Sequence, residues 1–228
     1  MAEKFNPDNK LTHKELAQQL RKPVGNIGKE VGLQMNRGNK FICINSYKVL
    51  NPKACDRILE IGMGNGFFIK DLLAMADNLD YTGVDFSKTM VEEASALNKK
   101  LIGTGKVRFC EASIEKLPFN DNSFDCITTT NTLYFWPKPE NDVKELSRVL
   151  KPGGKLLIGY RSKRFMDKIV LSKYGFEKYE IQDVESLLKN ASFKQVSTQV
   201  IDEPDLDFDG KTFKIQGVYS VCHKSCHS

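Results

Sequence analysis

Residues 57–66 read RILEIGMGNG, and this stretch decides the fold. Its first half is the short β-rich run of a strand, and three glycines at alternate positions follow at once. Glycines remove side chains, so that backbone N–H groups can approach a ligand. Residues 67–76, FFIKDLLAMA, have the apolar spacing of a helix, whose start adds partial positive charge suited to a carboxylate or phosphate. The sequence therefore predicts a strand, a ligand-binding loop and a helix in direct succession.

The spacing of this loop differs from two common nucleotide loops. The pattern is E-x-G-x-G-x-G from Glu60 to Gly66. A nicotinamide-cofactor fingerprint, G-x-G-x-x-G, would need glycine where Phe67 stands, and a Walker loop would need a Gly-Lys-Ser/Thr ending. Neither loop is present.

Strands and helices alternate outward from this motif. We expect further strands at 80–85, 106–111, 124–130 and 155–160, with helices after Ser87 and over 141–150. After a helix capped by Asp183, strands are expected at 193–201 and 212–222, joined by turn formers without a crossover helix, so they should pair antiparallel. The prediction is an α/β fold with a doubly wound, mostly parallel sheet of seven strands.

The N-terminal 54 residues have a different character. Residues 11–50 predict short helices, with a capping box at Thr12 and Glu15, a break at Pro23 and a stop at Gly38. Residues 1–54 carry ten Lys or Arg against four Asp or Glu, so their net charge is +6, ten minus four. The net charge of the whole chain is only +5. We therefore divide the chain into a basic helical extension or lid, 1–54, and a main domain, 55–228.

Composition narrows the class of protein. The chain has 228 residues with 40% hydrophobic and 28% charged side chains, which predicts a packed core. Without an apolar run of about 18–20 residues or a signal-peptide layout, we expect a cytoplasmic protein that does not enter a membrane. Cys222, His223, Cys226 and His227 are spaced too tightly for an ordinary zinc finger, so we interpret them as a strand end and a frayed tail, and we expect no metal.

Asp85 is the second candidate binding residue, because it closes the second strand 25 residues after Glu60. A carboxylate at this strand end faces the crevice at the switch point of the sheet and can accept hydrogen bonds from both hydroxyls of a ribose. Glu111 and Ala112 follow the third strand in the same way.

Four ordered motifs in residues 57–160 resemble class I S-adenosylmethionine-dependent methyltransferases, and more narrowly the branch of the quinone-biosynthesis C-methyltransferases. They are LEIGMGNG, GVDFSKTMVEEA, the run from LPF to SFD, and ELSRVLKPGGKLLI. The resemblance implies a Rossmann-like methyltransferase fold, S-adenosyl-L-methionine as cofactor, and transfer of its methyl group by in-line displacement.

The resemblance also implies roles for individual residues. Glu60 would lie near the amino-acid end of the cofactor, and Thr130 and Asn131 would close the opposite wall near its methionine part. Asp85 would take the ribose hydroxyls and Phe86 would pack on the adenine. The remaining positions are the loop glycines Gly62, Gly64 and Gly66, then Ala112, which would touch adenine mainly through its backbone, and Glu111, where the family usually has Asp.

The acceptor is expected to be a small molecule, with nucleic acid disfavoured. One alternative is an RNA or protein methyltransferase that docks its substrate through the basic N-terminal helices; another is a nucleoside-binding module without turnover. No catalytic base is assigned, although Tyr47, Tyr134 or Tyr160 could reach such a site. The aromatic run 131–136 is consistent with an acceptor wall and with ordinary core. The acceptor atom and the oligomeric state stay open.

Overall fold

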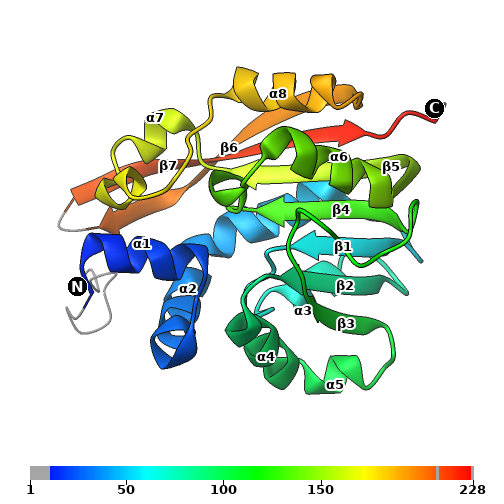
Figure 1. The fold of residues 1–228 in the computed structure, drawn as a ribbon, viewed down its shortest axis with the longest axis horizontal. Coiled ribbons are helices and arrows are strands. Elements are labelled where there is room, and N and C mark those ends of the chain that lie inside the picture. Colours follow the sequence, from blue (N-terminus) through cyan, green and yellow to red (C-terminus); the bar gives the residue numbers. More distant parts are fainter. Residues whose placement is uncertain (1–10, 209–210, 227–228) are drawn as a thin grey trace.

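The computed structural model describes residues 11–208 and 211–226, and a seven-stranded sheet forms its centre (Figure 1). The strand order is β3-β2-β1-β4-β5-β7-β6. The first five strands are parallel, and β7 runs antiparallel to both β5 and β6. The strands are β1 (Arg57–Ile61), β2 (Asp80–Asp85), β3 (Val107–Glu111), β4 (Phe124–Thr130), β5 (Leu150–Tyr160), β6 (Lys194–Phe208) and β7 (Lys211–His223). The predicted mostly parallel sheet and its antiparallel end are confirmed.

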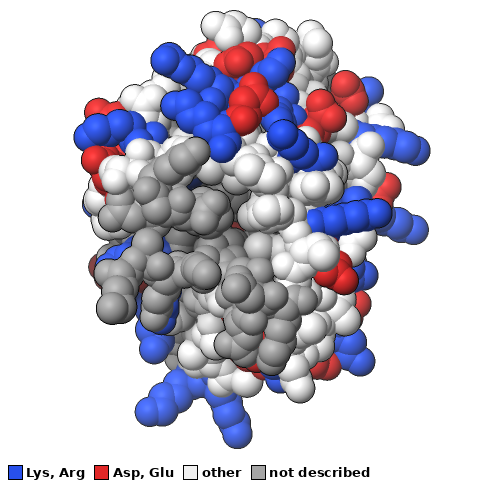
Figure 2. All heavy atoms as spheres, turned by 90° about the vertical axis from the view of Figure 1, so that its left-hand side faces the viewer, with Lys and Arg blue, Asp and Glu red and all other residues white. Residues whose placement is uncertain are grey.

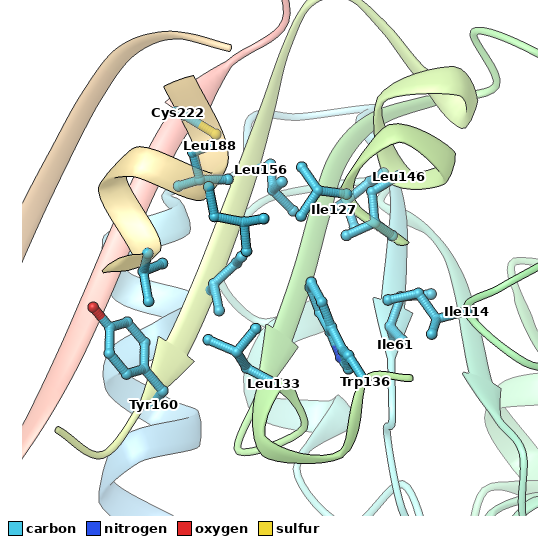
Figure 3. Packing of buried hydrophobic residues seen from close by; sticks show 14 of the residues in the cluster. Ile61, Ile114, Ile127, Leu133, Trp136, Leu146, Leu156, Tyr160, Leu188 and Cys222 are labelled. Carbon is cyan, nitrogen blue, oxygen red and sulfur yellow. The ribbon is translucent and has the colours of Figure 1, made fainter. Parts of the chain in front are cut away.

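Helices pack on both faces of this sheet. The helices after β1 are α3 (Ile69–Leu73), α4 (Lys88–Leu97), α5 (Lys99–Ile102), α6 (Pro139–Val149), α7 (Lys163–Met166) and α8 (Ile181–Asn190). Neighbouring residues of β1 pack on opposite faces of the sheet. Leu59 joins the core that contains Leu146 of α6 and Leu188 of α8, and Ile58 joins another core with Leu72 of α3. Figure 3 shows Leu146 and Leu188 in the first of these cores. This alternation is the period of two that a strand imposes on its side chains.

The N-terminal extension forms two helices, where three short ones were expected. The capping box of Thr12 and Glu15 starts α1 (His13–Arg21), as predicted. After Pro23, α2 (Gly25–Leu50) runs unbroken for 26 residues, so the expected stop at Gly38 is wrong. A glycine inside a helix costs about 1 kcal/mol relative to alanine. Burial of α2 on both sides of Gly38, at Val31 before it and Ile42 after it, outweighs this cost.

Four other boundaries differ from the prediction. The helix α3 covers only 69–73 of the expected 67–76. The strand β5 already begins at Leu150, which was expected to end a helix, whereas the strand was expected from 155. The cap of α8 is Glu180, and Asp183 completes a capping box from the third helical position. Residues 202–208 were expected to be a turn-rich linker, but they continue β6, because its register shifts between Glu203 and Leu206 and pairing resumes.

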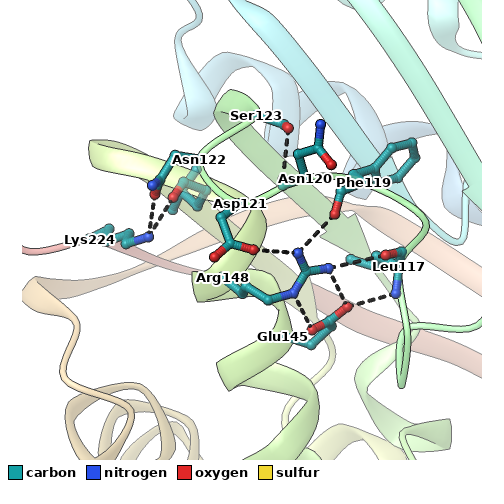
Figure 4. Close-up of polar contacts among 10 residues, drawn as sticks. Leu117, Phe119, Asn120, Asp121, Asn122, Ser123, Glu145, Arg148 and Lys224 are labelled. Carbon is teal, nitrogen blue, oxygen red and sulfur yellow. Dashed lines mark hydrogen bonds and ion pairs between the residues drawn. The ribbon is translucent and has the colours of Figure 1, made fainter.

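Arg148 of α6 holds the loop between β3 and β4 in place (Figure 4). Its guanidinium donates to the carbonyl oxygens of Leu117 at 3.1 Å and Phe119 at 2.8 Å, and it contacts the carboxylates of Glu145 and Asp121. Two of the four sequence motifs, the run from LPF to SFD and ELSRVLKPGGKLLI, therefore contact each other here.

The described residues include no helix that is long and apolar enough to cross a membrane. At the C-terminal end, Cys222 is buried in the sheet and Cys226 is exposed, while His227 lies outside the described residues. No group of three potential metal ligands occurs in 11–208 and 211–226.

Candidate active site

The glycine loop turns sharply between β1 and α3. Gly62, Gly64 and Gly66 have φ values of 70°, 57° and 64°, a conformation that favours glycine. A Cβ atom at Gly62 would lie 2.3 Å from a methyl group of Thr132, and one at Gly66 would lie 2.9 Å from the side-chain amide of Asn98. At Gly64 a Cβ atom would meet nothing within 4 Å. Packing therefore requires glycine at the outer two positions, whereas Gly64 faces open space.

Asp85 connects the end of β2 to this loop. Its Oδ2 accepts a hydrogen bond from the Gly64 N–H at 3.0 Å, and its Oδ1 accepts one from the Ser87 N–H at 2.9 Å. The side chain is buried, and burial raises the pKa of its carboxyl to about 6, against the opposing effect of the backbone hydrogen bonds. The group is therefore ionised at neutral pH but close to titration.

Glu60 lies buried beneath the loop between two tyrosines. Tyr47 of α2 donates a hydrogen bond to its Oε1 at 2.9 Å, and Tyr81 of β2 donates to its Oε2 at 2.6 Å. Burial raises the pKa of Glu60, and the two hydrogen bonds oppose that shift. The pKa values of both tyrosines are also raised by burial, so both stay protonated donors. The C-terminal half of α2 is thus joined to the centre of the sheet.

A cavity of about 220 Å³ opens at the carboxyl ends of the parallel strands. It is bordered by nine of the ten residues that the sequence singled out: Glu60, Gly62, Gly64, Gly66, Asp85, Phe86, Ala112, Thr130 and Asn131. Glu111 is exposed and is not part of this lining. Three residues that follow it in the chain, Ser113, Ile114 and Glu115, line the cavity instead.

One wall of the cavity comes from α2. The sequence analysis expected a helical lid from residues 1–54 and named Tyr47, but it did not single out the other residues of this wall. Small and polar residues face inward along this helix: Gly32, Asn36, Asn39, Cys43 and Tyr47. Their spacing of three or four residues follows one face of a helix. That spacing was the available signal, but the expected break at Gly38 concealed it. The side-chain nitrogen of Asn36 is buried with no partner in the described chain, so it is available to a ligand.

The first half of α2 is tied to α4 across the cavity. The Ser87 hydroxyl donates to the carbonyl of Pro23, and the Gly25 N–H donates to Oγ1 of Thr89 at 3.2 Å. Lys29 forms an ion pair with Glu93 at 2.8 Å. These contacts hold the helix over the glycine loop.

The end of β4 supplies the opposite anchor of α2. Oγ1 of Thr130 donates to the Ser46 hydroxyl at 2.9 Å, and Nδ2 of Asn131 donates to Oδ1 of Asn39 at 3.0 Å. Asn131 adopts a positive φ of 57°, which turns the chain at the strand end. Both residues therefore lie where α2 meets the sheet.

Comparison with known proteins agrees with this geometry. Residues 59–158 match a family described as a methyltransferase domain. The demethylmenaquinone methyltransferase of Clavibacter sepedonicus is 30% identical over 183 residues, which cover 78% of this chain and 71% of that protein. The chain belongs to the class I S-adenosylmethionine-dependent methyltransferases. Its cofactor is S-adenosylmethionine.

Three further proteins are similar to part or most of this methyltransferase. The 27-O-demethylrifamycin SV methyltransferase of Amycolatopsis mediterranei is 35% identical over 112 residues, which cover 49% of this chain and 40% of that protein. A solved S-adenosylmethionine-dependent methyltransferase from Aquifex aeolicus superposes with a TM-score of 0.63 at 24% identity, covering 93% of this chain and 99% of that one. A methyltransferase solved with the Trm112 activator of Haloferax volcanii has a TM-score of 0.72 at 16% identity, covering 85% and 94%. These two structures share the fold.

None of the three tyrosines considered as bases in this methyltransferase is poised to ionise. Tyr47 donates to Glu60, and the pKa of Tyr134 is raised by burial. Burial raises the pKa of Tyr160 to about 12, and this residue borders neither of the two cavities described for the chain. In the aromatic run 131–136, Leu133 is core and Phe135 borders the cavity, and a role of the run as acceptor wall stays a prediction.

Proposed function

We propose that this methyltransferase transfers the methyl group to a small molecule that enters beneath α1 and α2. The observation that carries the proposal is that residues from Leu20 to Tyr47 border the cavity at the glycine loop, so the space is covered. Figure 1 shows α1 and the first half of α2 beyond the arrowheads of the central strands. A covered cavity suits a compact acceptor, and two of the relatives are named for a quinone and an antibiotic.

We assign the cofactor to this cavity on the chemistry of its walls. The Asp85 carboxylate would accept from the ribose hydroxyls, and Phe86 and Ala112 would border the adenine. A side chain at position 64 would project into the open space beside the loop. Because Gly64 has no side chain, the cofactor can closely approach the backbone of the loop. Glu60, Thr130, Asn131 and the unpaired amide of Asn36 would surround the amino-acid end. Glu111 would reach the adenine only from outside the described lining.

The chain's own residues would then act by positioning. S-adenosylmethionine supplies a sulfonium-bound methyl group, which needs an attacking atom in line with the departing sulfur. The loop and Asp85 would fix the direction of that bond, and α2 would exclude water. Because the buried tyrosines stay protonated, the acceptor would have to present an atom that is already nucleophilic or readily loses its proton.

The charge of the N-terminal extension gives little support to a polymer substrate. Lys29 is paired with Glu93, and Lys22 lies 5.3 Å from the ring centre of Phe86. Figure 2 shows Lys and Arg interspersed with Asp and Glu on the described part of the face beside these helices. Such a mixed surface differs from the basic stripe typical of nucleic-acid binding.

The expected cytoplasmic location also stays a prediction.

A labelling experiment tests the proposal. Three reactions would each contain the protein and S-adenosylmethionine with a deuterated methyl group. One reaction would receive the metabolite fraction of a cell extract, one the RNA fraction and one the protein fraction. Mass spectrometry should find the label in the metabolite fraction. Label that appears only in RNA or protein would contradict a small-molecule acceptor.

A further inference from the structure

A second cavity of about 190 Å³ adjoins the first one. Five residues border both cavities and form the neck between them: Leu20, Met35, Asn39, Asn131 and Phe135. The first cavity contains the glycine loop and Asp85, where the cofactor would bind. A methyl group on that cofactor would reach a molecule in the second cavity through this neck.

The walls of the second cavity are mainly apolar. Aromatic rings of Phe135 and Phe176 lie 4.6 Å apart between centres, and Tyr134 packs against both. Aliphatic side chains from the segment that follows β5 complete the wall, among them Met166, Ile169 and Leu171. Such a surface stabilises a ligand by burying its apolar area.

Arg161 is the one charged residue among the lining residues that the structure describes, and its charge is compensated. Its two terminal nitrogens lie 2.7 Å and 2.9 Å from the two carboxylate oxygens of Glu203. Only 8% of the Arg161 side chain and 3% of the Glu203 side chain are exposed, and Tyr219 donates a further hydrogen bond to Glu203 at 3.3 Å. A buried carboxylate that pairs with the guanidinium through two hydrogen bonds compensates its charge, so the pair leaves no net charge for a ligand to pair with.

A chain of hydrogen bonds sets the polarity of the neck. The backbone N–H of Arg161 donates to the Tyr134 oxygen, and the Tyr134 hydroxyl donates to Oδ1 of Asn131 at 3.1 Å. Nδ2 of Asn131 then donates to Oδ1 of Asn39 at 3.0 Å. The amide nitrogen of Asn39 is left to donate and has no partner among the described residues, so the neck offers a hydrogen-bond donor.

We propose that the second cavity is the acceptor subsite, that it selects an uncharged, largely apolar molecule, and that Asn39 binds an oxygen atom of that molecule at the neck. The proposal rests on the proposed function, because it places the acceptor next to the cofactor cavity. Selection against anions follows from the Arg161–Glu203 pair, and orientation of the acceptor follows from Asn39.

Binding of simple probes to the full chain, saturated with S-adenosylhomocysteine, tests this selection. The probes are 2-naphthol, which is uncharged at neutral pH, 2-naphthoate, which is an anion of similar size, and naphthalene, which has no oxygen. Calorimetric titration should show 2-naphthol binding at least tenfold more tightly than 2-naphthoate. Equal or tighter binding of 2-naphthoate would overturn the proposal.

Three variants locate the effect. Glu203→Gln exposes the charge of Arg161, so the preference for 2-naphthol should fall at least tenfold, whereas Arg161→Met combined with Glu203→Gln should restore it. Asn39→Leu should weaken 2-naphthol at least fivefold without weakening naphthalene. Ile169→Trp should fill the cavity and abolish binding of all three probes.

Titration of S-adenosylhomocysteine into each sample separates a failure of the proposed function from a failure of the acceptor subsite. If it fails to bind to the wild-type protein, the proposed function fails. If it binds but 2-naphthol does not, or if Ile169→Trp leaves 2-naphthol binding unchanged, only the acceptor subsite is refuted. Should Glu203→Gln fail to fold, the wild-type selectivity and the Asn39→Leu comparison still decide the question.

Discussion

The backbone N–H of Gly64 donates a hydrogen bond to Oδ2 of Asp85 across 3.0 Å. This contact joins the glycine loop after β1 to the carboxylate at the end of β2, two features separated by 21 positions in the chain. Asp85 therefore shapes the loop in addition to offering oxygen atoms to a ligand. Its removal should disturb both.

Asp85→Ala should weaken S-adenosylhomocysteine binding by about 1.5–3 kcal/mol, roughly ten- to a hundredfold, the value of hydrogen bonds to a charged group. Calorimetric titration measures the loss. Asp80→Ala is the matched control, because Asp80 begins the same strand and pairs with Arg108 at the surface. Normal binding by Asp85→Ala would show that Asp85 only stabilises the turn.

Cofactor affinity should fall as the pH drops below about 6. Burial raises the pKa of Asp85 to about 6, and only the ionised carboxylate accepts hydrogen bonds from two hydroxyls. A one-proton linkage at this pKa predicts about tenfold weaker S-adenosylhomocysteine binding at about pH 5 than on the plateau near pH 7. Asp85→Asn should bind weakly with a much flatter pH profile. A flat profile in the wild-type protein would place the relevant titration elsewhere.

Gly64→Val should abolish cofactor binding without unfolding the protein. A side chain at Gly64 would project into open space at the loop, so it competes with the ligand and clashes with no described residue. Gly105→Val is the control for backbone strain: Gly105 also has a positive φ, 76°, and open space around it, but it lies in a turn away from the cavity. Thermal unfolding should fall similarly for both variants, and only Gly64→Val should lose binding.

The N-terminal extension is predicted to be separable from the fold only in part. Val31 packs with Leu16 and Leu171 in a small cluster outside the main cores, whereas Tyr47 and Leu50 belong to a main core. Deleting residues 1–40 should leave a folded, less stable protein that still binds the cofactor, though more weakly without Asn36, but that has lost most transfer activity, because the wall containing Asn36 and Asn39 is gone.

Deleting residues 1–50 is the informative comparison, because it also removes the Tyr47 hydroxyl from Glu60. A buried carboxylate without that donor costs about 1–3 kcal/mol or more. The longer deletion should be insoluble or melt far lower. Full activity of either truncated protein with its natural acceptor would refute the lid.

The sequence predicted the sheet and most of the residues that border the cavity at the glycine loop, because both depend on local patterns. Alternating strand and helix periods, a glycine loop and Asp85 are each visible within a few residues. The continuity of α2 could not be read in this way, because Gly38 is a local stop signal that tertiary burial at Ile42 overrides. The strand over 202–208 was likewise missed, because pairing with β7 overrides turn-forming residues such as Pro204.

The second cavity was the least predictable part of the site. Its neutrality depends on Arg161 meeting Glu203, which is 42 positions away, and its donor depends on Asn39 meeting Asn131, which is 92 positions away. Neither pairing leaves a signal in one sequence, because the contacts exist only after β6 and α2 have docked.

The central claim is that the cavity at the glycine loop binds S-adenosylmethionine. Calorimetric titration of the full chain with S-adenosylmethionine, its demethylated product and a nicotinamide dinucleotide tests it most directly. We predict that the first two bind in the micromolar range with one site each and that the dinucleotide does not compete. Tight binding of the dinucleotide, together with no binding of either S-adenosyl compound, would contradict the account.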